Sequence, residues 1–532
     1  MALPEQACGQ FSSNPQTGPE GWSFTHRPAL HWGTGIRTPI AGSKSRSLAI
    51  RRSPNAQQCC GVSDRIAGRI RSAFMDGVAV AILAAGRGTR MRSPLAKVLH
   101  PVCGVPMVAW SISAARAAGA SVTVVVGSPD RALEEHLPEG VIHAVQPEPD
   151  GTAGALAAAV DHLADSQAVV VLAGDVPLID AATISAVLEA HSENGAAATI
   201  ATMRLDDPSG YGRIVRDASG TFVRVVETKN VEDASPEELL IDEVNTGVVV
   251  FRVAGLKELL AGVGSANAQG ERYLPDAVAA LADRGEKVLA VEVHDAALTI
   301  GVNDRADLAR VQELAQRRIC ERHMRNGVTI EAPGSVAIDA SVEIGEDSTI
   351  LLGSVLRGTT IIGSGSVIGP HSVLEDAEVG NGAEVTMSRL VLAKVGDGAT
   401  VGPFAYLRPG ADVGPNAKAG TFVELKNTRL GEGAKVPHLS YVGDADVGAG
   451  ANLGASTITA NYDGRNKHRT VVGARARTGV HTSLVAPVTV GEGAVTGAGS
   501  AITEDVPDGS LGIARPRQTV IEDYAERNRD GG

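Results

Sequence analysis

Aliphatic side chains recur at every sixth position through one stretch in the second half of the chain. The run comprises Ile338, Ile344, Ile350, Leu356, Ile362, Ile368 and Leu374. Glycine follows three of them directly, at Gly345, Gly363 and Gly369, where the backbone can bend. A period of six fits neither an α-helix nor an ordinary strand. It predicts a parallel β-helix, in which each side of a coil turns one aliphatic side chain inward.

The same spacing returns further along the chain. It resumes at Val395, Val401, Leu407, Val413, Ala419 and Leu425, then at Leu430, Val436 and Val442, before the aliphatic–glycine pairs Val447-Gly448 and Leu453-Gly454. A flexible glycine-rich linker would not keep branched side chains in phase, so we expect about 160 residues to form one solenoid. Its stacked coils would bury the core and leave flat outer faces that can pack against other copies.

Polar residues interrupt this repeat in two places. The larger interruption is a ten-residue polar insert at 461–470, and the second holds Glu424, Lys426, His438 and Tyr441. Because the regular coils serve to bury a core, we expect function where the regularity ends.

The first half of the chain alternates apolar strand-like runs with helical segments. Strands are predicted from Val78 and at 122–126, 141–145, 168–175 and 197–202, with helices beginning near Met107 and at 152–164 and 181–191. This alternation predicts an α/β domain with a mostly parallel, doubly wound sheet. Residues 304–326, which have helical spacing of leucine and other aliphatic side chains, predict a helix that connects the two halves.

Candidate chemistry in the first half lies where two predicted strands end. The glycine-rich turn Ala84–Gly88 follows the first strand, and Gly174-Asp175 follows another. Ligands of doubly wound sheets bind beyond the carboxyl ends of the strands. Arg90 and Lys97 place two cations just after the turn, as a triphosphate requires, although no Walker pattern is completed. Asp175 is a candidate ligand for Mg²⁺ beside those phosphates.

Composition narrows the function classes. The 532 residues carry a net charge of −13, yet residues 1–74 hold nine basic and three acidic side chains, so the rest of the chain is strongly acidic. Such a body is poorly suited to bind nucleic acid non-specifically. Only Cys103 and Cys320 fall outside residues 1–74, which excludes a disulfide framework. No apolar run is long enough for a membrane span, so a cytoplasmic protein is expected.

Residues 1–74 have no helical or strand period. They mix Pro, Gly, Ser, Gln and Arg, and we expect them to be disordered. An alternative is that the natural start is Met75, directly before the first strand, and a targeting peptide is a third interpretation.

The motifs together resemble one enzyme family. LAAGRGTRM followed by KVLH at 97–100 is similar to the signature of sugar-nucleotide pyrophosphorylases, and DDPSGYGRIV, VVETK and EVNTGV at 206–249 match one member. With the hexapeptide array, residues 76–520 resemble the bifunctional bacterial N-acetylglucosamine-1-phosphate uridylyltransferase/glucosamine-1-phosphate acetyltransferase. The resemblance implies a uridylyltransferase domain at 75–303, a connecting helix at 304–327, and a left-handed β-helix acetyltransferase domain at 328–532 that forms a homotrimer.

In the first half, the resemblance implies a site for UTP and N-acetylglucosamine 1-phosphate. The implied nucleotide and sugar residues are Leu83, Ala84, Ala85, Gly86, Lys97, Gln146, Gly151, Thr152, Gly212, Glu227, Asn245 and Asn303. Asp175 and Asn303 would bind Mg²⁺, and Arg90 and Lys97 would support the chemistry. The reaction would be in-line attack of the sugar phosphate on the α-phosphorus of UTP, with release of pyrophosphate.

In the second half, the resemblance implies acetyl transfer from acetyl-CoA to glucosamine 1-phosphate. His438 would be the general base, oriented or stabilised by Glu424. Glucosamine 1-phosphate would be bound by Arg408, Lys426, Tyr441 and Asn452, and acetyl-CoA by Ala455, Asn461, Tyr462, Val480, Ala498 and Arg515. Ala173 and Val480 depart from the family pattern, which usually has a hydroxyl side chain or serine there, so each removes one hydrogen bond.

Several other interpretations stay open at this point. Asp175 is also compatible with a surface turn, and His438 with a buried structural histidine or a zinc ligand, although no other histidine lies at the spacing of a ligand pair. Two other functions also stay open: a uridylyl- or guanylyltransferase whose array serves only to form a trimer, or a structural scaffold with a vestigial nucleotide domain.

Overall fold

The computed structural model describes residues 77–529 apart from 87, 229–233, 266–269, 294 and 528. The predictions for residues 1–74 therefore lie outside the described residues. The described residues all belong to one unit of the chain, Asp64–Gly532.

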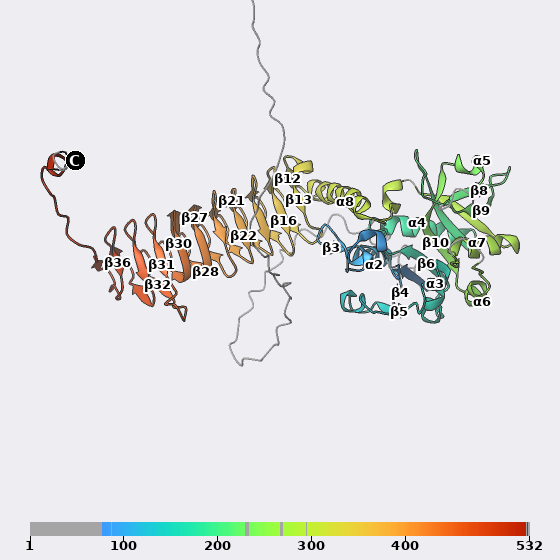
Figure 1. The fold of residues 1–532 in the computed structure, drawn as a ribbon, viewed down its shortest axis with the longest axis horizontal. Helices are drawn as coiled ribbons and strands as arrows, with labels where there is room; N and C mark the ends of the chain where they lie inside the picture. Colours follow the sequence, from blue (N-terminus) through green and yellow to red (C-terminus); the bar gives the residue numbers. More distant parts are fainter. Residues whose placement is uncertain are drawn as a thin grey trace, which may run out of the picture. The chain divides into compact units, whose positions relative to one another are not determined.

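The first half is built on a sheet whose main path has the order β11-β7-β10-β6-β1-β4-β5 (Figure 1). Its strands are β1 (Val78–Leu83), β4 (Val122–Gly127), β5 (Ile142–Val145), β6 (Ala168–Ala173), β7 (Ala198–Arg204), β10 (Glu243–Arg252) and β11 (Val288–Glu292). All the strands predicted from the sequence are present. The strands β6, β1, β4 and β5 run parallel, as do β7 and β11.

Helices cover both faces of this sheet, because alternate residues of each buried strand point to opposite sides. Val80 and Ile82 of β1 pack in one core with α2 (Met107–Ala118) and α4 (Ala181–Glu193). Ala79 and Ala81 pack in another core with α3 (Thr152–Ala159), α6 (Leu256–Ala261) and α7 (Leu274–Asp283). The predicted doubly wound α/β fold is therefore confirmed.

The sheet is not purely parallel, because one region contains antiparallel pairs. The long strand β10 runs antiparallel to β6 and β7. A hairpin of β8 (Arg213–Arg216) and β9 (Phe222–Val226) joins β10 through the pair Val244 and Arg213. The hairpin closes through a turn in which the Gly220 N–H donates to Asp217 O, 3.0 Å away.

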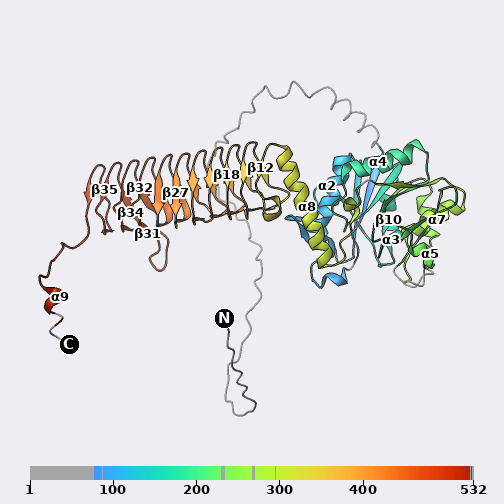
Figure 2. The same ribbon diagram turned by 90° about the horizontal axis from the view of Figure 1, so that it is seen from above.

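The second half is an array of short parallel strands stacked coil on coil (Figure 2). Ile338 in β13 (Ala337–Ile338) is in register with Leu356 in β16 (Val355–Arg357), which is in register with Leu374 in β19 (Val373–Glu375). Three hexads therefore make one coil. The hexad aliphatic side chains are buried, except that Ile344 is only partly buried. This stacking is that of the predicted left-handed parallel β-helix.

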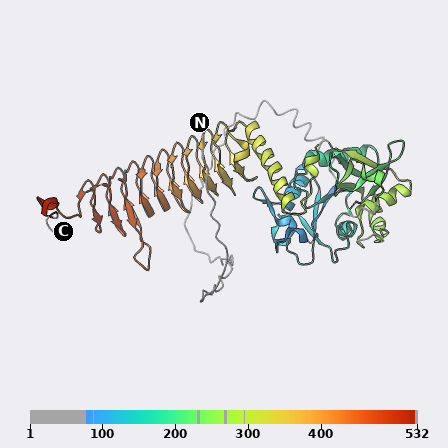
Figure 3. The ribbon, with the colours of Figure 1, turned by 45° about the horizontal axis from the view of Figure 1, so that its top comes forward.

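Later coils of the array carry the polar residues. Their strands include β25 (Tyr406–Leu407), β27 (Lys418–Thr421), β28 (Glu424–Leu430), β29 (Lys435–His438), β30 (Tyr441–Val447), β31 (Ile458–Ala460) and β32 (Thr470–Val472). The predicted insert leaves the array between β31 and β32 as a loop, which Figure 3 shows standing out from the coils. A bridge between Tyr462 and Lys467 closes this loop on itself.

Helix α8 (Arg305–Arg325) joins the two halves, as predicted. It begins where Asp304 accepts hydrogen bonds from the N–H groups of Ala306 and Asp307, an N-cap. Its buried side chains lie in the core that continues into the array, and it contacts β2 (Pro101–Val102), β12 (Thr329–Ile330) and β13. Within the described part of the chain, no helix is both long and apolar enough to cross a membrane.

Candidate active sites

The first candidate site lies at the carboxyl ends of β1 and β6, where the strand order changes direction. From β1 the chain continues to β4 and β5 on one side, then returns to β6 on the other. A crevice at such a switch point is the usual ligand site of a doubly wound sheet. A side chain at Gly174 would be crowded here, because a Cβ atom would lie 3.0 Å from the carbonyl oxygen of Leu83.

A cavity of about 670 Å³ opens at this edge. The predicted residues that line it are Leu83, Ala84, Ala85, Gly86, Lys97, Gln146, Gly151, Thr152, Asp175, Glu227 and Asn245. They come from several loops, so the fold brings together most of the predicted nucleotide and sugar residues. Sequence reasoning missed the segment Glu271–Pro275, which also lines the cavity. The Leu274 N–H donates to Thr152 Oγ1, 3.0 Å away, so this segment contacts the start of α3.

Charged side chains gather at one end of the cavity. Lys97 Nζ forms an ion pair with Asp175 Oδ2. The Val302 N–H donates to the carbonyl oxygen of Asp175, 2.9 Å away, and Arg90 Nη2 donates to Asn303 Oδ1, also 2.9 Å away. Arg90, Lys97, Asp175 and Asn303 therefore lie in one neighbourhood, although Arg90 and Asn303 do not line the cavity itself.

The donor atoms here suit a magnesium ion held largely by substrate. Asp175 offers a carboxylate and Asn303 an amide oxygen, and the described residues contain no cluster of three His, Cys, Asp or Glu side chains that would hold a metal alone. Mg²⁺ typically binds one or two carboxylates together with phosphate oxygens and water. A site of this composition is therefore compatible with Mg²⁺ when a nucleotide is present.

Gln146 also lines the cavity and lies directly after β5. It is 4% exposed, and its Nε2 atom donates to Asp150 Oδ1 at 2.7 Å and to the carbonyl oxygen of Gly151 at 3.0 Å. Gly151 has a φ of 108°, and a Cβ atom there would lie 2.4 Å from Arg272 O, so only glycine fits.

Asn245 is placed by an irregularity in β10. The register between β10 and β7 shifts between Asn245 and Val249, and the Gly247 N–H donates to Asn245 Oδ1 at 2.9 Å. The Asn245 N–H donates to Gly212 O at 2.8 Å. Gly212 thus supports Asn245 from the β8 side and does not line the cavity.

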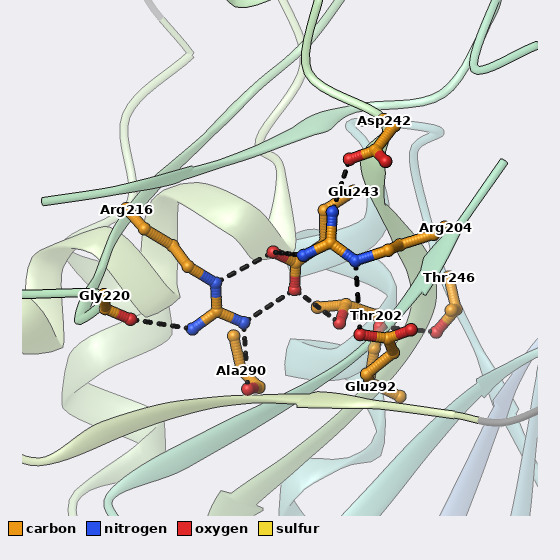
Figure 4. Close-up of polar contacts among 10 residues, drawn as sticks. Thr202, Arg204, Arg216, Gly220, Asp242, Glu243, Thr246, Ala290 and Glu292 are labelled. Carbon is orange, nitrogen blue, oxygen red and sulfur yellow. Dashed lines mark hydrogen bonds and ion pairs between the residues drawn. The ribbon is translucent and has the colours of Figure 1, made fainter. Parts of the chain in front are cut away.

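A buried ion network lies on β10 two residues before Asn245 (Figure 4). Glu243, which is 3% exposed, accepts from Arg216 Nη2 at 2.6 Å, Arg216 Nε at 2.8 Å and Thr202 Oγ1 at 2.7 Å. Burial raises the pKa of Glu243, but the hydrogen bonds and charge of Arg216 outweigh it and hold this pKa below its ordinary value. Arg204 contacts Asp242, Glu243 and Glu292 from the outer side. The network joins the β8–β9 hairpin to the main sheet.

The second candidate site lies on the array, where His438 ends β29. Val436 and Val442 on either side are fully buried, whereas His438 is exposed and in register with Thr421. The His438 side chain therefore points away from the aliphatic interior. Among the described residues, its imidazole has no hydrogen-bond partner. Glu424 Oε1 instead accepts from Arg408 Nη1 at 2.9 Å, so its proposed action on His438 stays a prediction.

Cationic side chains gather on neighbouring coils beside Glu424. Tyr406, Glu424 and Tyr441 are in register on three coils, and Lys426 is in register with Gly443. Lys426 Nζ lies 3.7 Å from Asp444 Oδ2. Sequence reasoning missed Lys467 of the loop, whose contact with Lys426 lowers the pKa of Lys467. Two ammonium groups this close indicate a site that favours an anion.

Asp444 ties this cationic cluster to the loop. It is 7% exposed and accepts from Asn427 Nδ2 at 2.7 Å and from Asn461 Nδ2. Burial raises the pKa of Asp444, but these hydrogen bonds and Lys426 outweigh it and hold the pKa below its ordinary value. The structure therefore brings Asn461 next to Lys426.

The other predicted acetyl-CoA residues lie elsewhere on the coils of a single chain. The His481 N–H donates to Ala455 O and the Gly499 N–H to Val480 O, both at 2.8 Å, so Ala455, Val480 and Ala498 follow one edge of the array. The Ser456 N–H donates to His438 O at 3.2 Å, which places His438 on the same edge. Tyr462, Asn452 and Arg515 are exposed. The backbone of Asn452 forms isolated parallel β-bridges with Lys435 and with Arg477.

Comparison with known proteins gives the family. Residues 80–292 match the MobA-like NTP transferase domain. The chain is 48% identical over 455 residues to the bifunctional protein GlmU of Brevibacillus brevis, covering 85% of this chain and 98% of the relative. It is 47% identical over 453 residues to that of Carboxydothermus hydrogenoformans (85% and 100% covered) and 46% over 467 residues to that of Mycolicibacterium vanbaalenii (86% and 94%). The chain belongs to the bifunctional GlmU family.

Proposed function

We propose that this protein makes UDP-N-acetylglucosamine, a precursor of peptidoglycan, in two steps at two sites. The array acetylates glucosamine 1-phosphate with acetyl-CoA, and the α/β half then transfers a uridylyl group from UTP to N-acetylglucosamine 1-phosphate. The observation that carries the proposal is that two separate groups of reactive side chains lie on the two halves of a chain covering 98% of a bifunctional relative.

For uridylyl transfer, the residues of the cavity bind and align the reactants. The cations Lys97 and Arg90 offset the negative charge of the triphosphate, while Gln146 holds the base. Asn245 and Glu227 hold the sugar phosphate, whose oxygen attacks the α-phosphorus in line as pyrophosphate leaves. Magnesium bound at Asp175 and Asn303 would neutralise phosphate charge.

For acetyl transfer, the residues of the array bind a sugar phosphate and accept a proton. Arg408 and Lys426 bind the phosphate, and Tyr441 and Asn452 hold the sugar. The neutral His438 imidazole takes the proton from the amino group of glucosamine 1-phosphate as nitrogen attacks the thioester carbonyl. Coenzyme A leaves as the thiol. Ala455, Asn461, Tyr462, Val480, Ala498 and Arg515 form the acetyl-CoA side.

The array assembles as a homotrimer, and residues of a neighbouring copy complete the acetyl-transfer site. Support comes from three exposed apolar side chains, Phe404, Phe422 and Leu439, which we call the apolar corner. They are 54%, 58% and 58% exposed, and the two phenylalanine rings stack with centroids 5.3 Å apart. Leu439 directly follows His438. A second copy that covers this corner would also lie next to the proposed base, His438.

A dual assay tests both activities on the purified full chain. Glucosamine 1-phosphate, acetyl-CoA, UTP and Mg²⁺ are supplied, and free thiol and pyrophosphate are measured separately. Asp175→Asn should reduce pyrophosphate release by at least about 10²-fold while thiol release continues. Asp165→Asn, an exposed carboxylate of the same half, is the control. Equal loss of both products in Asp175→Asn would assign Asp175 to the fold, and absence of thiol release in the unaltered chain would leave the array as an assembly device.

A further inference from the structure

Asp150 occupies the loop between β5 and α3, behind the end of the cavity that Gln146 lines. Its Oδ1 atom accepts from Gln146 Nε2 at 2.7 Å, and its Oδ2 atom accepts from Arg272 Nη1 at 3.1 Å. Its carbonyl oxygen accepts from the Arg272 N–H at 2.6 Å. Packing is close, because a Cβ atom on Gly154 would lie 1.8 Å from Asp150 Oδ1. The carboxylate is therefore held on both of its oxygens.

Arg272 itself has little freedom to move. Its Nε atom donates to Val263 O at 3.2 Å, and its Nη2 atom donates to Leu260 O. With these donors committed to backbone carbonyls, the guanidinium presents Nη1 to Asp150 in a fixed direction. The Arg272 side chain thus sets the position of the Asp150 carboxylate.

The partners of Gln146 determine which way its amide faces. Asp150 Oδ1 and the Gly151 carbonyl oxygen both contact the same end of the amide, and both are acceptors. Only the NH₂ group can sit between two acceptors, so the amide orientation follows from chemistry. The Gln146 Oε1 atom then remains for a ligand, since no described residue donates to it. The Gly151 N–H also donates to no described residue.

We propose that Asp150 is a specificity-determining positioning residue: it fixes the Gln146 amide so that the cavity offers an acceptor, which selects uracil over cytosine. This inference rests on the proposed binding of the nucleobase at Gln146. The N3–H of uracil donates to Gln146 Oε1, and a uracil carbonyl accepts from the Gly151 N–H. Cytosine carries a lone pair at N3, which would face the Gln146 oxygen and leave two buried acceptors in contact.

The structure indicates what an amide at position 150 would do. In Asp150→Asn, the asparagine oxygen is drawn to Arg272 Nη1, because its NH₂ group would oppose another donor there. The asparagine NH₂ group then faces Gln146, whose oxygen turns to accept it. The Gln146 NH₂ group would turn towards the cavity, where it suits N3 of cytosine. The Gly151 carbonyl opposes this flip, so the change in preference is partial.

The test measures kcat/KM for UTP and for CTP by pyrophosphate release with N-acetylglucosamine 1-phosphate. The unaltered full chain should favour UTP by about 10²-fold or more. Asp150→Asn should lower the UTP:CTP ratio by at least about tenfold, partly through a gain with CTP. Asp150→Ala, which removes an acceptor and adds no donor, should lower it less. Asp161→Asn makes the same chemical change at an exposed site paired with Lys257 and should keep the ratio.

A cooperative unfolding transition of the α/β half in urea reports that each variant is folded, and should one Asp150 variant fail to fold, the other carries the test. An unchanged UTP:CTP ratio in a folded Asp150 variant overturns the inference, even when both rates fall together. Absence of pyrophosphate release by the unaltered chain would instead overturn the proposed uridylyl transfer.

Discussion

At the scale of single residues, position within the coil decides whether a side chain serves packing or chemistry. Val436 and His438 are two residues apart on the same strand, yet the valine is fully buried and the histidine is exposed. Residues two apart on a regular strand face the same side, so the different exposure reflects the end of β29 at His438, where the coil turns and Leu439 has a φ of 49°. A change at His438 can therefore remove chemistry and leave the core untouched.

His438→Ala should lower acetyl transfer by about 10²–10⁴-fold, the usual effect of losing a general base. Uridylyl transfer should be unchanged. The acid side of the pH profile should also disappear, because it reflects protonation of an imidazole that must be neutral to accept a proton. Thiol release measured across pH checks both outcomes. His371→Asn, at another exposed histidine of the array with a φ of 51° that asparagine tolerates, is the control. Retention of most of the rate in His438→Ala would refute the assignment.

At the scale of elements, the β8–β9 hairpin depends on one buried carboxylate. Arg216 at the end of β8 reaches Glu243 on β10 and the carbonyl oxygen of Ala290, 3.1 Å away on β11 (Figure 4). Gly212, just before β8, accepts from the N–H of Asn245. The hairpin and Asn245, the proposed sugar-binding residue, are therefore coupled through backbone and side-chain contacts.

Glu243→Gln should destabilise the α/β half by about 2–3 kcal/mol, because it leaves the Arg216 charge without its buried partner. The KM for N-acetylglucosamine 1-phosphate should rise, since Asn245 loses support. Chemical denaturation and pyrophosphate kinetics measure the two effects. The control is Arg204→Gln, whose side chain is 52% exposed and should cost less than about 1 kcal/mol. Equal effects of the two changes would show that the buried position of Glu243 does not increase its contribution to the free energy of unfolding.

Helix α8 carries a buried histidine, His323, whose protonation is disfavoured in the folded chain. Burial, with a smaller contribution from Arg322, lowers the pKa of His323 from 6.5 to about 4. The unfolded chain therefore takes up a proton between these two pH values that the folded chain does not bind. Stability due to this group is present above pH 6.5 and is lost as the pH falls towards 4. Burial lowers the pKa of His191 in α4 in the same way, to about 4.

His323→Leu should flatten the dependence of unfolding free energy on pH in this window, by up to roughly 3 kcal/mol between its two ends. His191 would supply the acid sensitivity that remains. Urea denaturation at a series of pH values checks the change in slope, with His136→Gln, at an exposed histidine, as the control. A slope identical to that of the unaltered chain would mean that His323 is charged in the folded state.

At the scale of the whole molecule, one edge of the array carries apolar side chains that the chain itself does not cover. Phe404, Phe422 and Leu439 form the apolar corner, and all three have positive φ values of 49–59°. Bulky side chains rarely adopt this conformation, so the edge combines backbone strain with exposed apolar surface. Burial against other copies would offset both costs.

Phe422→Asp and Leu439→Asp should each weaken the proposed trimer and reduce acetyl transfer, because a carboxylate would be buried between copies. Aspartate tolerates a positive φ, so the coil itself should persist. Light scattering gives the assembly state. Leu392→Asp is the matched control, since Leu392 is 56% exposed with a φ of 47° and lies outside the apolar corner. A stable monomer of the unaltered chain that still transfers acetyl groups would refute the trimer.

The period of the apolar residues was enough to predict both folds. Six-residue spacing and glycine after the aliphatic positions indicate which side chains turn inward. The direction of these side chains depends only on neighbouring residues in the sequence. The strands from Val78 to 202 and helix α8 were likewise predictable from local spacing. The antiparallel course of β10 was not, because strand direction depends on which distant strand it meets.

The candidate sites show the same division between what the local sequence indicates and what only the tertiary structure decides. The sequence and its family resemblance identified Lys97, Gln146, Asp175 and His438 as candidates. Only tertiary structure placed Arg272 on Asp150, Lys467 beside Lys426, and Arg216 on Glu243. Each of these contacts joins segments separated by a loop or by many strands. Their geometry depends on how whole elements pack, and that packing decides which way an amide faces or whether a carboxylate is charged.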